Sequence, residues 1–156
     1  MIYHFSIAAR QPAHVADVIA ELWRGRAYPF PPTPGSHIAF AGDARRSAIE
    51  VYPLGTELVP GDTEVAKTTN PSPAPATATH AAIATPLTEA EVHAIAEREG
   101  WRSLTCDRGG LFRVIEVWLE NRLMLELLTD EMQAAYLASM TTDGWEAMLA
   151  GRPASA

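Results

Sequence analysis

The chain has 156 residues, of which 47% are hydrophobic and 20% are charged, a composition typical of an ordinary globular domain. Its formal net charge is −7. Polyanions such as nucleic acids and anionic membranes would be repelled by this charge, so we expect neither as a partner. The single cysteine, Cys106, excludes an intramolecular disulfide and cannot form a zinc–thiolate cluster alone.

The first half of the chain predicts a strand, a helix, a proline-rich loop and a β-hairpin, over residues 1–9, 11–25, 28–36 and 37–55. In the helix, Pro12 suits the first turn, apolar residues recur at helical spacing, and Gly25 ends the pattern. The prolines of the loop remove hydrogen-bond donors and exclude regular structure there. No secretory signal precedes these elements, and no apolar run approaches the roughly 18 residues that span a bilayer. A cytoplasmic protein without a membrane segment is therefore expected.

Residues 59–78 are rich in proline, threonine and alanine and predict a linker between two halves. The second half predicts a strand, a helix, three strands and a helical tail, over residues 79–87, 88–100, 101–109, 112–120, 123–129 and 130–156. Thr88, Glu91 and Gly100 mark the two ends of the helix. We expect one domain over residues 1–129, with modules at 1–58 and 79–129.

The two halves repeat one another in their elements and in their polar residues. Each half starts with a strand that holds a histidine, His4 in "YHFSIA" and His80 in "THAAIA". Each half also has a strand with a glutamate in apolar surroundings, Glu50 in "AIEVYP" and Glu126 in "MLELLT". A structural repeat with the same polar residues at matching strands indicates one shared site.

Two imidazoles and two carboxylates are ligands suited to a divalent ion such as Zn, Ni, Co, Mn or Fe. Such an ion can polarise a carbonyl group, and a carboxylate that leaves it can act as a general base. The period of a strand places Ser6 on the face of His4 and Tyr52 on the face of Glu50. Other polar residues are weaker candidates: His14 and His93 are expected to be exposed on helices, His37 is a spare ligand, and Arg108 could meet an anionic substrate.

On these strands and on the order of the modules, the chain resembles the vicinal oxygen chelate superfamily, which includes glyoxalase I, bleomycin-resistance proteins and extradiol dioxygenases. The resemblance implies an α+β fold in which two βαβββ modules form a curled mixed sheet, here with an added C-terminal helix. It also implies that His4, Glu50, His80 and Glu126 bind a metal ion. By the same analogy Glu126 is the proton-shuttling base, and Glu50 is a ligand and possible second base. The chain lacks the "D-P-x-G-N" turn that is usual before the last strand.

The activity implied first is that of a glyoxalase-like lyase or isomerase, which moves a proton of a small α-oxygenated carbonyl compound through an enediolate. A metal-free protein that binds a small molecule, of the bleomycin-resistance kind, is an alternative. So is an Fe(II) dioxygenase that uses two histidines and one carboxylate. The resemblance further implies a homodimer, because paired modules often complete their sheets across a subunit boundary.

Overall fold

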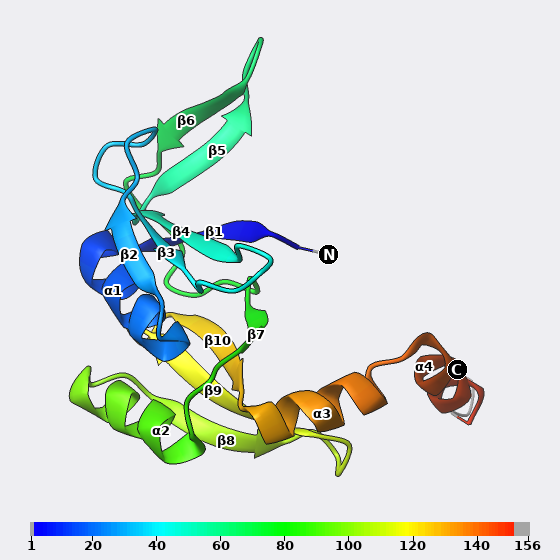
Figure 1. Ribbon diagram of the computed structural model, residues 1–156. Coiled ribbons are helices and arrows are strands. Elements are labelled where there is room, and N and C mark those ends of the chain that lie inside the picture. The colour runs from blue at the N-terminus through cyan, green and yellow to red at the C-terminus, as the bar shows by residue number, and fades with distance from the viewer. Residues whose placement is uncertain (1, 152–156) are drawn as a thin grey trace.

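The structure is a computed structural model that describes residues 2–151. The last five residues of the tail predicted at 130–156, and Met1, lie outside this range. The first module consists of β1 (His4–Ala9), α1 (Pro12–Trp23), β2 (Arg26–Pro29), β3 (His37–Phe40) and β4 (Ala48–Pro53). The second consists of β7 (Ala81–Ala84), α2 (Glu89–Arg98), β8 (Ser103–Asp107), β9 (Arg113–Leu119) and β10 (Leu123–Leu128). Figure 1 shows the two modules one above the other.

Each module builds its own four-stranded sheet, and the two sheets have the same topology. The strand orders are β1-β4-β3-β2 and β7-β10-β9-β8. The first strand of each module pairs in parallel with the last, and the other pairs are antiparallel. This arrangement confirms the predicted α+β fold with two βαβββ modules.

Helix α1 shows how the modules depend on one another. Its N-cap residue, Gln11, makes no capping bond with its side chain. The free backbone N–H groups of Arg10 and Gln11 instead donate to the carboxylate of Glu120, which lies in the β9–β10 turn of the second module, at 2.7 and 2.9 Å. A carboxylate at this end of a helix is favoured by the helix dipole. At the other end, a Cβ atom on Gly25 would lie 1.9 Å from the carbonyl oxygen of Phe40, so only glycine fits.

Helix α2 begins with the capping box that the sequence predicts. The Thr88 hydroxyl accepts a hydrogen bond from the backbone N–H of Glu91, and the Glu91 carboxylate accepts one from the backbone N–H of Thr88. These two bonds satisfy N–H groups that a helix start leaves free. The pKa of Glu91 is lowered, first because its carboxylate accepts the backbone hydrogen bond of Thr88.

One hydrophobic core joins the helix-covered faces of both modules. It contains Leu22 and Trp23 of α1 together with Val92 of α2 and Leu125 of β10, all buried. Polar bonds accompany this packing: the indole N–H of Trp23 donates to the carbonyl oxygen of Ala84 at 3.0 Å. The ion pairs Arg24–Glu91 and Arg98–Glu21, and a polar contact between His14 and Glu99, also connect α1 to the α2 region. The two modules therefore share one core and are joined by polar contacts at its edge.

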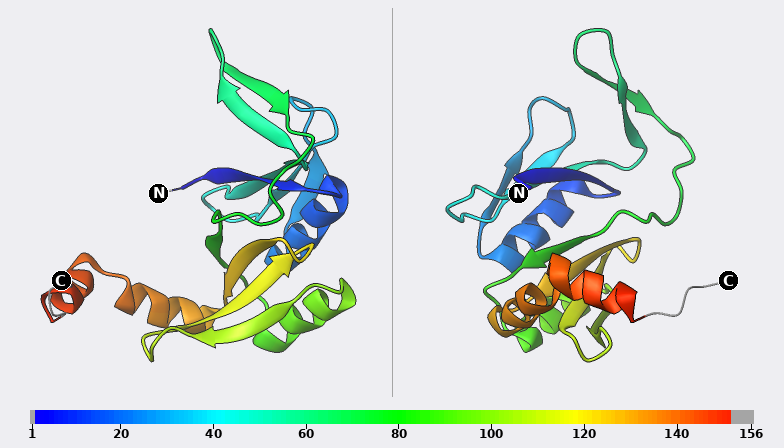
Figure 2. Two further views of the ribbon diagram at one scale, coloured as in Figure 1. Left: turned by 180° about the vertical axis from the view of Figure 1, so that it is seen from behind. Right: turned by 90° about the vertical axis from the view of Figure 1, so that its right-hand side faces the viewer.

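The segment predicted as a linker is partly ordered into a hairpin. β5 (Thr56–Pro60) and β6 (Val65–Thr69) pair in antiparallel register and form a two-stranded sheet of their own. All residues of the two strands except Glu57 and Lys67 are apolar or threonine, a composition that suits strands despite the surrounding prolines. Figure 2 shows this hairpin projecting away from both modules. Residues 70–80 then return to β7 without regular structure.

The tail forms two helices, α3 (Asp130–Ser139) and α4 (Thr142–Ala150), in place of one. Met132 of α3 is buried in the core, and Tyr136 packs edge-on against Phe112 with ring centroids 5.0 Å apart. Helix α4 stands clear of the modules on the side opposite α1 and α2 (Figures 1 and 2).

Within residues 2–151, no helix combines the length and apolar character needed to cross a bilayer.

Candidate functional site

The first predicted pair, His4 and Glu50, lies together on the face of the first sheet that α1 does not cover. Strand register places Ser6 beside Glu50 and His4 beside Ala48. The His4 Nε2 and Glu50 Oε1 atoms are 3.9 Å apart. The Glu50 side chain is 13% exposed and that of His4 is 60% exposed, so the carboxylate is fixed and the imidazole is open.

Two hydroxyl groups hold the Glu50 carboxylate in place. Ser6 Oγ and Tyr52 OH both donate to Glu50 Oε2, at 2.9 and 2.7 Å. Both residues lie on the face that the sequence predicts. Burial raises the pKa of Tyr52, and its hydrogen bond to the Glu50 carboxylate raises it further. Because both donors engage Oε2, Oε1 is the oxygen that faces His4.

Glu126 lies on the corresponding face of the second sheet, but its partners differ. In the β9–β10 register Glu126 is directly opposite Glu116. Two like charges in this position repel each other. The guanidinium of Arg108 lies between them, and its Nη2 atom donates to Glu126 Oε1 at 2.5 Å and to Glu116 Oε1 at 2.8 Å. The hydrogen bond from Arg108 also lowers the pKa of Glu116.

His80, predicted within a strand, lies immediately before one. β7 begins at Ala81, and His80 is exposed, with its Nδ1 atom 3.3 Å from the carbonyl oxygen of Ala78. In the parallel register Ala82 is opposite Glu126, so His80 lies two residues before the position that pairs with Glu126. This is the same offset as that of His4 before Ser6, which pairs with Glu50.

Within one copy of the chain, the structure brings together His4 and Glu50 but does not place all four residues around one point. Among residues 2–151, no group of three or more His, Cys, Asp or Glu side chains is placed to hold a metal ion. The reason is geometric: the modules pack through their helix-covered faces, and the four residues lie on the other faces. The spare candidate His37 also does not help, because it pairs with the buried Val51 on the helix-covered side.

The His4–Glu50 pair nevertheless fits a metal as half of a ligand set. Nitrogen and carboxylate oxygen ligands lie about 2.0–2.2 Å from ions such as zinc, so two neighbouring ligands of a tetrahedral ion are about 3.4 Å apart. The observed distance is 3.9 Å, so the exposed His4 ring would have to move about half an ångström toward Glu50 for both to bind one ion. Ser6 and Tyr52 supply the hydrogen bonds that orient a ligating carboxylate in many metal sites.

Two hollows adjoin this pair. One of about 480 Å³ lies between β1 and β7 and is lined by His4, Phe5, Trp23 and residues 81–86, among others. A smaller one, of about 210 Å³, is lined by Ser6 and Tyr52 on one side and by residues of the 70–80 segment on the other. The larger hollow has the size of a small-molecule site and places His4 in its wall.

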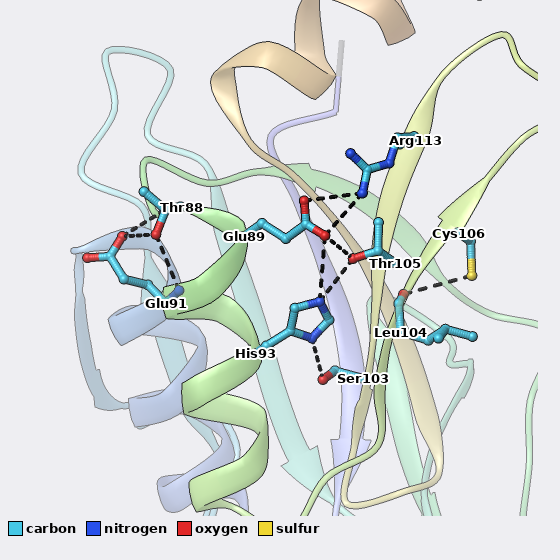
Figure 3. Close-up of polar contacts among 9 residues, drawn as sticks. All are labelled: Thr88, Glu89, Glu91, His93, Ser103, Leu104, Thr105, Cys106 and Arg113. Carbon is cyan, nitrogen blue, oxygen red and sulfur yellow. Dashed lines mark hydrogen bonds and ion pairs between the residues drawn. The ribbon is translucent and has the colours of Figure 1, made fainter.

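A second polar cluster, which the sequence did not indicate, lies between α2 and β8 (Figure 3). His93 contacts Ser103 Oγ through Nδ1 at 2.8 Å and Thr105 Oγ1 through Nε2 at 2.9 Å. Thr105 donates to Glu89, which also accepts from Arg113. His93 is therefore not simply exposed as predicted. Its partners are 10 and 12 residues away in sequence, and no helical or strand spacing signals such a contact.

Comparison with known proteins identifies the fold. No protein-family model matches the chain, and no curated protein matches its sequence. Among solved structures, it is similar to the trypanothione-dependent glyoxalase I of Leishmania major, with 18% identity and a TM-score of 0.53 over 93% of this chain and 98% of that one. A putative glyoxalase family protein of Bacillus anthracis matches with 15% identity and a TM-score of 0.54, over 81% and 92% of the two chains. An integron cassette protein from V. cholerae matches with 12% identity and a TM-score of 0.50, over 83% and 94%.

These likenesses concern the fold. They show that the chain has the fold of these glyoxalase proteins, as the sequence predicts, and they extend over nearly the whole of each solved chain.

Proposed function

We propose that the protein is a metal-dependent lyase or isomerase with a glyoxalase fold, and that a second copy of the chain completes its site. The substrate class is a small carbonyl compound with a neighbouring oxygen. The single observation that carries the proposal is the His4–Glu50 pair, with Nε2 and Oε1 3.9 Å apart on an open sheet face.

The second copy supplies the other half of the ligand set. His80 and Glu126 occupy the equivalent positions of the repeated module, and they too lie on a face that their own helix leaves open. If the open face of the first module meets the open face of the second module in another copy, a histidine and a carboxylate come from each side. A two-fold symmetric dimer forms two such sites.

The bound ion would polarise the substrate carbonyl. The residues of the chain then perform the remaining tasks. Tyr52 and Ser6 keep the Glu50 carboxylate fixed through Oε2. Glu126 takes the proton from the carbon that bears the neighbouring oxygen and returns it to the former carbonyl carbon, while the hydroxyl proton passes from the first oxygen to the second. For this, the Glu126 carboxylate must exchange the hydrogen bond of Arg108 for the substrate. Arg108 retains Glu116 as its partner during this exchange.

Complementation between two inactive variants tests both the ligands and the second copy. The His4→Ala, Glu50→Gln variant and the His80→Ala, Glu126→Gln variant should each lack tightly bound metal when purified without chelator. Unfolded and refolded together, the two form mixed dimers in which one of the two sites has all four ligands. Metal analysis should then show about half a site per chain in those dimers.

A chain with Glu64→Gln and Glu97→Gln is the control, because it neutralises two exposed carboxylates outside the proposed ligand set and should keep its metal. If the unmodified protein holds no divalent ion and takes none up, the proposal is wrong. Metal retained by the double variants would contradict the ligand assignment.

A second candidate is a metal-free protein that binds a small molecule, and one observation favours it. Arg108 already neutralises Glu126, so this carboxylate needs no metal ion to be stable where it is. This candidate predicts that a bound ligand quenches tryptophan fluorescence equally well with and without a chelator.

A further inference from the structure

Within residues 2–151, helix α4 buries none of its side chains against the rest of the chain. All of its residues are exposed, from Thr142 to Ala150. It has nine residues, and isolated helices shorter than about 12–15 residues are marginal in water. Thr141 caps it by accepting a hydrogen bond from the backbone N–H of Gly144, but one cap does not replace tertiary packing. A stable α4 therefore requires a surface to pack against.

The composition of α4 indicates which kind of surface this is. Trp145, Met148 and Leu149 are spaced as i, i+3 and i+4 and form one apolar stripe, and they are 47%, 39% and 58% exposed. Asp143 and Glu146 add negative charge beside the stripe. Residues 130–151 contain four carboxylates and no lysine or arginine. The partner surface should thus be apolar and basic.

The open face of the first sheet has this character next to His4 and Glu50. Across strands β2, β3 and β4, one row of neighbouring side chains consists of Arg26, Phe40 and Ala48. A second row on the same face consists of Tyr28, Ile38 and Glu50. Tyr28 and Phe40 are both large and exposed, with ring centroids 6.2 Å apart. Exposed aromatic residues beside an arginine are typical of protein interfaces.

The turn that follows Phe40 adds further positive charge. Arg45 and Arg46 are exposed in this β3–β4 turn. Within the described part of the chain, neither of them nor Arg26 forms an ion pair with a carboxylate. Three unpaired arginines and two exposed aromatic rings complement a helix with an apolar stripe and two carboxylates.

We propose that α4 of one copy docks on this surface of a second copy, over Arg26, Tyr28, Phe40 and the β3–β4 turn. The inference rests on the homodimer of the proposed function and adds a swapped helix that borders the His4–Glu50 half of the site. The side on which α4 projects agrees with it: α4 lies opposite α1 and α2, where the open sheet faces are (Figures 1 and 2). In the dimer, Trp145 fills the apolar part of the contact and Asp143 and Glu146 meet the arginines.

Removing the apolar stripe tests the docking in the full-length chain. The Trp145→Ala, Leu149→Ala variant should raise the dimer dissociation constant at least about tenfold, measured by sedimentation over a dilution series. Leu58→Ala is the matched control, because Leu58 is 47% exposed on the β5–β6 hairpin and lies outside the proposed contact. An unchanged constant in the double variant would overturn the proposal.

A charge exchange tests the partner surface itself. Arg45→Glu with Arg46→Glu should weaken the dimer by repelling Asp143 and Glu146, and adding Asp143→Arg with Glu146→Arg to the same chain should recover most of the lost affinity. Recovery supports the docking, because a fourfold variant that had only lost its fold would not regain a dimer. If the two sets of substitutions weaken the dimer independently, the proposal is wrong.

Metal analysis of the same samples separates this inference from the proposed function. A metal-containing dimer that is indifferent to the α4 and arginine variants overturns the docking alone. A dimer that depends on both sets of residues but binds no metal supports the docking and overturns the proposed function. A chain that stays monomeric at all concentrations overturns both.

Discussion

At the scale of single residues, the two glutamates of the proposed site are held by different chemistry. Glu50 accepts hydrogen bonds from two neutral hydroxyl groups, whereas Glu126 is paired with the positive charge of Arg108. A carboxylate held by neutral donors keeps its charge available for a metal ion. A carboxylate held by a guanidinium must exchange partners before it can act as a base. This difference agrees with Glu50 as the fixed ligand and Glu126 as the group that moves a proton.

The Tyr52 hydroxyl should therefore matter for metal binding. Tyr52→Phe removes one of the two bonds to Glu50 Oε2 and should weaken metal affinity about 10–100-fold, the usual effect of losing a group that orients a ligand. Isothermal titration with a divalent ion measures this. Tyr136→Phe is the control, since Tyr136 lies in α3 and packs on Phe112.

The Arg108 pair predicts a pH-dependent contribution to stability. The pKa of Glu116 in the folded chain is lowered by Arg108 below its unfolded value of about 4.3. Such a contribution is fully present above the unfolded value and is lost as the pH falls through the folded value. Arg108→Gln should thus cost about 1 kcal/mol of unfolding free energy near neutral pH, since Arg108 is partly exposed.

This cost should begin to shrink below about pH 4.3, the unfolded value for glutamate, and should disappear only once the pH is below the lowered pKa of Glu116 in the folded protein. Urea unfolding at several pH values measures it, with Arg102→Gln as a control that removes an exposed arginine without a carboxylate partner in the described residues. A cost that stays constant down to acid pH would show that Arg108 acts through packing and not through charge.

At the scale of elements, the two main helices start in different ways. Helix α2 contains its own capping box in the sequence, while α1 obtains its cap from Glu120 of the other module. The start of α2 could for this reason be predicted correctly from Thr88 and Glu91. The Glu120 cap could not, because 109 residues separate it from Gln11.

The capping box gives a direct prediction. Thr88→Ala should lower the free energy of unfolding by about 1 kcal/mol, because the N–H of Glu91 loses its acceptor. Urea unfolding at neutral pH measures the change. Thr63→Ala, in the exposed β5–β6 turn, should have no comparable effect. Equal stability of the two variants would mean that the first turn of α2 frays without cost.

At the scale of the whole molecule, a continuous core makes the modules interdependent. Leu22 and Trp23 of the first module pack in the same core as Val92 and Leu125 of the second. The Thr85 hydroxyl also donates to the carbonyl oxygen of Leu22 at 2.5 Å, so the end of α1 is bonded to the loop after β7. Two modules joined in this way should unfold together.

Leu22→Ala should expose this coupling. Leu22 is fully buried, and its truncation should cost about 2–5 kcal/mol through lost contacts and a cavity. Circular dichroism and tryptophan fluorescence should follow one shared transition in both the variant and the unmodified chain. Leu58→Ala, on the surface, is the control. Two separate transitions would show that the modules are independent domains.

The local pattern of the sequence was sufficient for most of the fold. Alternating apolar residues predicted strands around His4, Glu50 and Glu126, and helical spacing with caps predicted α1 and α2. These features depend on neighbours within a few residues, which is why they can be read without a structure. The β5–β6 hairpin was missed because its proline-rich and threonine-rich composition resembles that of a linker.

The candidate site could be predicted only in part, because local sequence patterns reach only a few residues along the chain. The sequence by itself determined that Ser6 shares the face of His4 and that Tyr52 shares the face of Glu50, since side chains of a strand alternate with a period of two. The parallel register of β1 and β4 then brought the two pairs to one face. The sequence also determined the repeat that relates Glu50 to Glu126. Only the tertiary structure decided that the two modules turn their helix-covered faces to each other and that Arg108 reaches Glu126. Those outcomes depend on packing and charge between segments far apart in the chain, which no local pattern specifies.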